Sequence, residues 1–125
     1  MKADCIFCSL PRKRIAENHH MFAVEDSYPV TPQHVLIISK DHKTDWFDLD
    51  NQEKSCLSAL IEIVSKKLKK EDPTIKGFNI GMNCGEEAGQ TIMHFHCHLI
   101  PRREGDMENP RGGVRHVIPG KGSYD

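Results

Sequence analysis

The chain of 125 residues has a mass of 14.2 kDa, which is the length of one domain. Its content of 38% hydrophobic and 28% charged residues is typical of a globular protein and excludes an intrinsically disordered chain. The 17 basic and 18 acidic side chains nearly cancel. Neither an electrostatic nucleic-acid interface nor binding to an anionic membrane surface is therefore expected.

Apolar runs and cysteine content indicate the compartment. No run of about 18 apolar residues is present, and no apolar stretch follows Met1 as in a secretory signal, so we expect neither a membrane span nor export. An odd number of cysteines without such a signal argues against a disulfide scaffold. We expect a cytoplasmic protein whose thiols are free or bind a metal. The five cysteines are Cys5, Cys8, Cys56, Cys84 and Cys97.

Two short apolar segments predict the first strands. Residues 21–24 form one, and the sequence Asp26-Ser27-Tyr28-Pro29 ends it because proline donates no backbone hydrogen bond. Residues 35–38 are four apolar, mostly β-branched residues, which is typical of a strand buried on both faces.

One long helix follows these strands. Asp50 or Asn51 can cap it, and Asp50 with Glu53 has the spacing of a capping box. Pro73 ends the helical pattern. Between these two ends, apolar residues recur at helical spacing and predict one buried stripe, made of Leu57, Leu60, Ile61, Val64 and Leu68.

The next apolar segments predict an antiparallel hairpin. Residues 78–83 and 92–100 read as strands, joined by the glycine-bearing loop 84–90, and Pro101 stops the second strand. The tail is polar and irregular. We expect a single domain, residues 1–125, with a core of about residues 5–102 and a tail over 103–125.

The second hairpin strand contains three alternating histidines. Because side chains alternate along a strand, His94, His96 and His98 should share one face. Three interpretations compete: an exposed polar face, a metal site to which one histidine contributes, or a nucleophile with helpers acting on an anionic phosphate.

These residues carry a resemblance to a known family. Residues 94–100 match the His-φ-His-φ-His-φ-φ signature of the histidine triad family, where φ is an apolar residue. The resemblance covers most of residues 5–102 in chain order. It includes the loop 87–91, the segment 29–40, and Cys5-Ile6-Phe7-Cys8, which is similar to the amino-terminal CxxC of bacterial members.

The resemblance implies a fold and an activity. The fold would be α+β, with an antiparallel five-stranded sheet, one long helix and a short N-terminal helix, usually in a homodimer. Such proteins bind purine nucleotides and hydrolyse or transfer nucleotidyl groups. The implied substrates are dinucleoside polyphosphates of the Ap4A type or nucleoside phosphoramidates, cleaved at the α-phosphate through a nucleotidyl-histidine intermediate. The alternative is a nucleotide-binding zinc protein with little turnover, acting as a scaffold or regulator.

The resemblance also implies residue roles. His96 would be the nucleophile, with a backbone carbonyl holding its other nitrogen, and His98 would donate to phosphate oxygens or the leaving group. His34 would support the triad or be a satisfied core histidine. The catalytic set is His34, His94, His96 and His98, and the substrate-binding set is Asp26 for ribose and Asn83, Gln90 and Thr91 for phosphates.

Two of these assignments keep a structural alternative, because Asp26 suits an Asx turn and Asn83 suits a strand end. Phe7, Phe22 and Ile38 would form an apolar slot for the base or simply pack in the core.

The same resemblance implies a structural zinc ion. In zinc-bearing members two cysteines and two histidines hold the metal, and a structural site requires four such ligands. The matching residues are Cys5, Cys8, His42 and His94. The ion would fix the N-terminal segment to the histidine-bearing strand.

Overall fold

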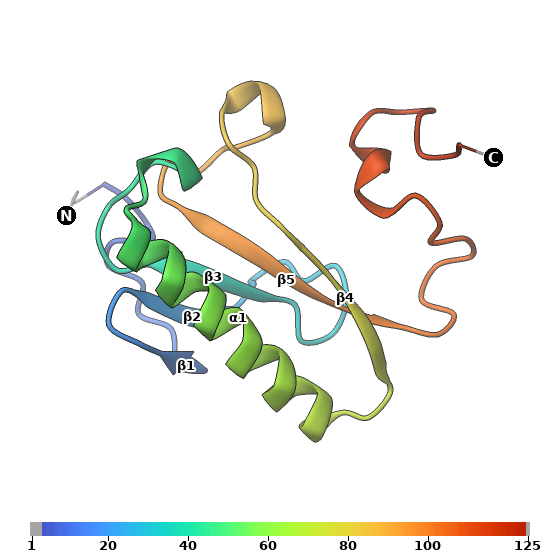
Figure 1. The fold of residues 1–125 in the computed structure, drawn as a ribbon, viewed down its shortest axis with the longest axis horizontal. Coiled ribbons are helices and arrows are strands. Elements are labelled where there is room, and N and C mark those ends of the chain that lie inside the picture. The colour runs from blue at the N-terminus through green and yellow to red at the C-terminus, as the bar shows by residue number, and fades with distance from the viewer. Residues whose placement is uncertain (1–3, 125) are drawn as a thin grey trace.

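The computed structural model describes residues 4–124, in which five strands form one antiparallel sheet (Figure 1). The strand order is β1-β2-β3-β5-β4. The predicted α+β fold is therefore confirmed. The main elements are β1 (Ala16–Glu17), β2 (Met21–Glu25), β3 (Val35–Ser39), α1 (Asn51–Glu71), β4 (Ile75–Gly81) and β5 (His96–Arg103). Three short 3-10 helices complete it, η1 (Trp46–Asp48), η2 (Glu86–Ala88) and η3 (Gly113–Val117).

Helix α1 begins with the predicted capping box. The Asp50 carboxylate accepts from the Glu53 amide at 2.8 Å, and the Glu53 carboxylate accepts from the Asp50 amide at 2.9 Å. These two bonds satisfy backbone donors that the first helical turn leaves unpaired. The predicted apolar stripe packs on the sheet, with Leu57, Leu60, Val64 and Leu68 buried and Ile61 partly buried. Neither this helix nor any other among the described residues is long and apolar enough to cross a membrane.

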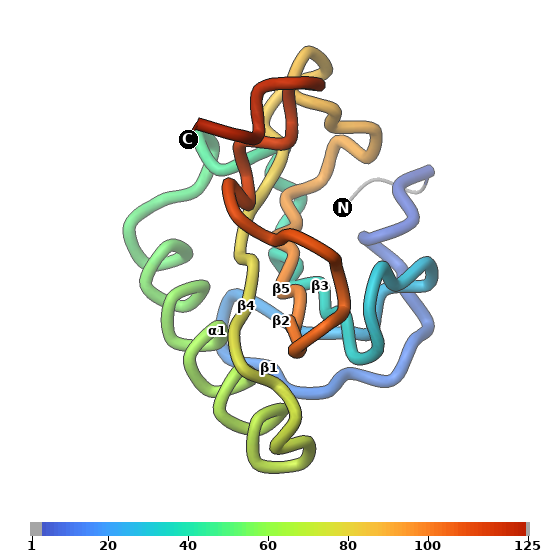
Figure 2. Tube along the Cα trace, turned by 90° about the vertical axis from the view of Figure 1, so that its right-hand side faces the viewer, coloured from blue at the N-terminus to red at the C-terminus, as the bar shows by residue number. Residues whose placement is uncertain are grey.

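The sheet separates two apolar clusters. Helix α1 covers the face that carries Ile37, Cys97 and Leu99. The opposite face carries Phe22 and Ile38, and strand register places His96 beside Ile38 on it. The N-terminal segment lies over this second face, on the side of the sheet away from α1 (Figure 2). The histidine-bearing face is thus free of the helix.

The predicted short N-terminal helix is not formed in residues 4–15. This segment contains turns, with the Cys8 amide donating to the Cys5 carbonyl at 3.2 Å. It then joins the sheet, because the Ile15 amide donates to the Ala23 carbonyl at 2.7 Å. Pro11 also lies within the segment and has no amide hydrogen to give a helix interior.

The hairpin strands differ from their predicted bounds. Strand β4 begins at Ile75, and β5 begins at His96 because the chain bends at residues 92–94. Strand β5 continues through Pro101, which was expected to stop it. Pairing with β3 ends at Leu99, so beyond that residue one side of β5 has no ladder for a proline to interrupt.

We expect Asp50→Ala to lower the free energy of unfolding by about 1 kcal/mol, because it removes the acceptor for the Glu53 amide. Denaturant titration followed by circular dichroism measures the change. Glu62→Ala is the matched control: Glu62 is an exposed carboxylate on the same helix, paired only with exposed Lys66, and its loss should cost less than about 0.5 kcal/mol. Equal effects of the two substitutions would contradict a stabilising capping box.

Candidate active site and metal centre

Strand β5 presents His96 and His98 on the face opposite α1, with ring centroids 5.6 Å apart. Nδ1 of His96 lies 2.8 Å from the backbone carbonyl oxygen of His94. A carbonyl only accepts, so this contact requires the proton on Nδ1. Nε2 of His96 consequently carries the lone pair, and a neutral imidazole in this state can attack an electrophile.

His98 lies within a second group of polar side chains. His34 is buried, and its Nε2 is 2.9 Å from Nδ1 of His98 and 3.4 Å from Oδ2 of Asp26. The Val30 amide donates to Nδ1 of His34 at 3.1 Å. Because Nδ1 accepts this bond, His34 carries its proton on Nε2 and faces two acceptors with it.

Both histidines are held in the neutral state. Burial lowers the pKa of His34, although the nearby carboxylate of Asp26 opposes the shift. Burial also lowers the pKa of His98, and the neighbouring His34 and His96 act in the same direction. Removing a cation from water disfavours the charged imidazole, so hydrogen bonding between neutral rings describes this group near neutral pH.

His94 differs from the other two histidines in its position, exposure and partners. It precedes β5, its side chain is fully buried, and Nε2 donates to the Ser39 carbonyl at 2.7 Å. The side chain therefore has no access to a phosphate. Its backbone carbonyl is the group that touches His96.

The four predicted metal ligands lie together. Nδ1 of His94 is 3.3 Å from Cys5 Sγ, 3.5 Å from Cys8 Sγ and 3.2 Å from Nδ1 of His42. Cys8 Sγ is 3.1 Å from Nδ1 of His42. A tetrahedral zinc ion places sulfur and nitrogen ligands about 3.5 Å apart, and two cysteines with two histidines are a common zinc ligand set. The donor set and its spacing therefore fit zinc.

The ligand orientation depends on a contact that the sequence does not reveal. Because Nε2 of His94 donates to Ser39, Nδ1 is left unprotonated and directed at the two sulfur atoms. Outer hydrogen bonds of this kind fix the tautomer and ring orientation of metal ligands. The acceptor is the backbone carbonyl of Ser39, and a backbone acceptor leaves no signal in the residue type.

Two predicted phosphate ligands are available to a substrate and one is not. Asn83 and Thr91 are exposed on either side of the loop 84–90. Gln90 is buried, and its amide donates to the Thr44 carbonyl at 2.6 Å and the Ile92 carbonyl at 3.2 Å. Its Oε1 accepts from the Gly85 amide at 2.8 Å. The Gln90 side chain thus joins the loop after β3 to two points of the loop between β4 and β5, and its expected contact with phosphate is not supported.

The other predicted binding groups are placed as follows. Asp26 uses Oδ1 to accept from the Tyr28 amide at 2.8 Å, which is the Asx-turn alternative, while Oδ2 faces His34. The Asx-turn interpretation of Asp26 is therefore confirmed, and ribose binding by Oδ2 stays a prediction. Phe7, Phe22 and Ile38 are buried and pack together, and the Phe7 ring lies 5.0 Å from the His96 ring.

Comparison with known proteins identifies the family. The family model described as "HIT domain" matches residues 9–105. The chain belongs to the HIT, or histidine triad, family. An uncharacterised HIT-like protein of Mycoplasma genitalium is 38% identical over 82% of this chain and 75% of the relative. An adenosine 5′-monophosphoramidase of Candida albicans is 30% identical over 82% of this chain and 72% of the relative.

One similar solved structure is of a zinc-bound HIT protein. The zinc-bound histidine triad family protein of Mycobacterium smegmatis superposes with a TM-score of 0.77 and is 31% identical, covering 85% of this chain and 80% of its own. Together with the four-ligand cluster, this neighbour supports zinc binding by the present HIT protein.

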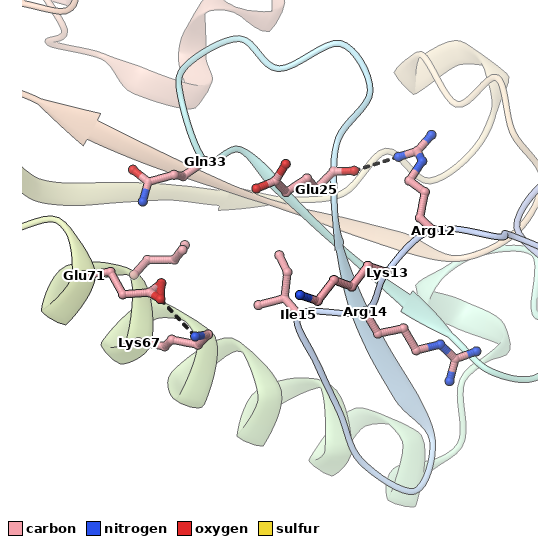
Figure 3. A pocket seen from close by; sticks show the side chains of 9 residues that line it. Arg12, Lys13, Arg14, Ile15, Glu25, Gln33, Lys67 and Glu71 are labelled. Atoms are coloured by element: carbon pink, nitrogen blue, oxygen red, sulfur yellow. Dashed lines mark hydrogen bonds and ion pairs between the residues drawn. The ribbon is translucent and has the colours of Figure 1, made fainter.

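A separate cavity of about 500 Å³ lies on the helix side of the sheet (Figure 3). Ile15 and Leu68 of the helix-side core line it, together with Glu25 and Gln33, the sequence neighbours of Asp26 and His34. On the wall formed by α1, Lys67 is paired with Glu71 at 3.0 Å. On another wall, the Arg12 guanidinium donates to the Glu25 carbonyl at 2.6 Å. The triad histidines do not line this cavity, so it is not the centre that they form.

We expect this HIT protein, purified without chelator, to contain about one zinc ion per chain, measured by inductively coupled plasma mass spectrometry. Cys5→Ser/Cys8→Ser should lose the metal and melt at a lower temperature, because metal binding to the folded state adds to its stability. Cys56→Ser is the control, since Cys56 lies on α1 outside the cluster. Metal-free wild type of unchanged stability would contradict the assignment.

Proposed function

We propose that this HIT protein is a nucleotide hydrolase and nucleotidyl transferase acting at the α-phosphate of dinucleoside polyphosphates, as in Ap4A, or of nucleoside phosphoramidates. The observation that carries the proposal is the 2.8 Å contact between Nδ1 of His96 and the His94 carbonyl. It holds the imidazole in the tautomer whose Nε2 can form a bond to phosphorus. The name of the Candida albicans relative, a monophosphoramidase, supports a phosphoramidate substrate.

The reaction would proceed by two displacements. Nε2 of His96 attacks the α-phosphorus, the N–P bond forms, and the bond to the leaving oxygen or nitrogen breaks with its electron pair. An amine leaving group takes a proton from Nε2 of His98 as it departs. Water then attacks phosphorus and gives a proton back to His98, the N–P bond breaks, and the nucleoside monophosphate leaves. Dividing the reaction in this way is the benefit of covalent catalysis.

The neighbouring groups would bind and orient the phosphate. His98 accepts at Nδ1 from His34, so its own proton is on Nε2, where it can donate to a phosphoryl oxygen. The Asn83 amide and Thr91 hydroxyl are exposed neutral donors that do not compete as bases. Oδ2 of Asp26, which also faces His34, would accept from ribose hydroxyls, as acidic residues do at other nucleotide sites.

Zinc would have a structural role. Its ligands would come from the N-terminal turn, from the loop after β3, and from His94, two residues before β5. The ion would therefore hold Phe7 in place. The centroid of the Phe7 ring lies 5.9 Å from that of His94 and 5.0 Å from that of His96. Thiolate ligands persist in a reducing compartment, and we propose the cytoplasm as the location.

We further propose a homodimer in which β4 forms part of the interface. Strand β4 is at the edge of the sheet, its seven residues pair only with β5 among the described strands, and Ile80 is 46% exposed. An uncovered edge strand is a template for pairing with another chain.

His96→Ala should reduce AMP release from adenosine 5′-phosphoramidate and from Ap4A by on the order of 10⁴-fold or more, the size found when other covalent enzymes lose their nucleophile. Wild type quenched during turnover should show an adenylyl group on His96 by mass spectrometry. His19→Ala, at an exposed histidine outside the site, is the control. Equal turnover by wild type and His96→Ala would refute the mechanism, and nucleotide binding without turnover would favour a scaffold.

Sedimentation equilibrium tests the dimer. A mass near twice 14.2 kDa is expected for wild type. Ile80→Lys should shift the protein toward the monomer, because it places a charge on the proposed interface. Lys69→Ala, a change at an exposed position near the end of α1, is the control. A wild-type mass of one chain at all concentrations would contradict the dimer.

A further inference from the structure

Asp26, His34 and His98 form a compact group, in which one ligand-type atom from each residue lies within 4.8 Å of the others. Such a trio could in principle hold a metal ion. The Val30 amide argues against it, because it donates to Nδ1 of His34 at 3.1 Å and so requires the ring proton on Nε2. The Nε2 atom that faces the group thus has no lone pair for a metal. The group is a hydrogen-bond network.

The network has one proton too few for its acceptors. His34 offers a single N–H, and both Nδ1 of His98 at 2.9 Å and Oδ2 of Asp26 at 3.4 Å face it. The His98 and Asp26 atoms are 3.9 Å apart, beyond hydrogen-bond distance. Whatever strengthens one of the two bonds from His34 therefore weakens the other.

The loop that carries this group is fixed at several points. The Asp26 amide donates to the His34 carbonyl at 2.9 Å, which closes the loop, and the Thr31 hydroxyl donates to the Pro101 carbonyl at 2.8 Å. The Arg103 guanidinium donates to the Pro32 carbonyl at 3.2 Å and is paired with Asp72 at 3.0 Å. These contacts fix the loop that carries Asp26 and His34. His98 and Asp26 therefore compete for the single His34 N–H within a fixed loop.

We propose that ribose binding sets the proton position of His98 through His34. The proposal rests on the proposed function, in which a ribose hydroxyl donates to Oδ2 of Asp26. That hydroxyl satisfies the carboxylate, and the His34 N–H becomes a full donor to Nδ1 of His98. His98 then holds its own proton on Nε2, the state in which it donates to the phosphoryl group.

The consequence is a specificity expressed in turnover. A nucleotide without ribose hydroxyls leaves Asp26 to compete for the His34 proton, so a smaller fraction of His98 is in the donor state. His34 is a positioning residue in this scheme, because it acts on the substrate through His98 and Asp26. The enzyme would favour ribonucleotides over deoxyribonucleotides in kcat as well as in KM.

The test compares adenosine 5′-phosphoramidate with its 2′,3′-dideoxy analogue. For wild type, kcat should fall about fivefold to tenfold with the analogue, the effect of one hydrogen bond. In His34→Gln the kcat ratio should be close to one, because an amide has two N–H groups and can donate to both acceptors. His19→Gln, the same change at an exposed histidine, should keep the wild-type ratio. A wild-type ratio of one, or an unchanged ratio in His34→Gln, would overturn the proposal.

A spectroscopic measurement covers the case in which His34→Gln does not fold. Long-range ¹⁵N–¹H spectra of wild type report which ring nitrogen of His98 carries the proton. AMP should shift His98 further toward the Nε2–H tautomer than 2′,3′-dideoxy-AMP does, and identical spectra would overturn the relay. Adenylyl-His96 should form with both phosphoramidates; its absence from both would reject the proposed function, whereas the tautomer comparison tests the relay independently.

Discussion

The structure depends on the position of His94, whose side chain contacts Cys5, Cys8 and His42 and whose backbone carbonyl contacts His96. Its Nδ1 lies among two sulfur atoms and a second imidazole, its Nε2 is held by the Ser39 carbonyl, and its own carbonyl accepts from His96. A shift of His94 would change both the arrangement of the four-residue cluster and the orientation of His96. The cysteine–histidine cluster and His96 are therefore linked through a single residue.

The two sides of the sheet have different functions. The helix side contains the larger apolar core, and its packing needs no metal or ligand. The opposite side has a smaller cluster around Phe22 and Ile38, which is closed by Phe7 from the N-terminal segment. In that segment Cys5 and Cys8 contact His94 and His42, which come from distant parts of the chain. His96 and His98 on the second side thus lie beside the cluster of Cys5, Cys8, His42 and His94.

Elements with strong local signals could be predicted from the sequence. The capping box of Asp50 and the apolar spacing of α1 gave the helix, because both are determined within a few residues. The alternation of side chains along a strand predicted that His96 and His98 lie on one face of β5 and that Cys97 and Leu99 lie on the other. It did not reveal that the His94 side chain is buried against Ser39 and the two cysteines, because those contacts join residues far apart in the sequence. The roles of Ser39 and Gln90 were also missed or misassigned, because their partners are backbone atoms of distant loops.

The buried amide of Gln90 has a consequence for how such an enzyme can be diversified. It connects the loop after β3, the start of the loop after β4 and the approach to β5 with three short bonds. A change in loop length between Gly85 and Gln90 would pull this anchor out of reach of Thr44. New substrate ranges are therefore more readily obtained by exchanging exposed side chains at constant length, such as Glu86 and Glu87, than by insertion or deletion.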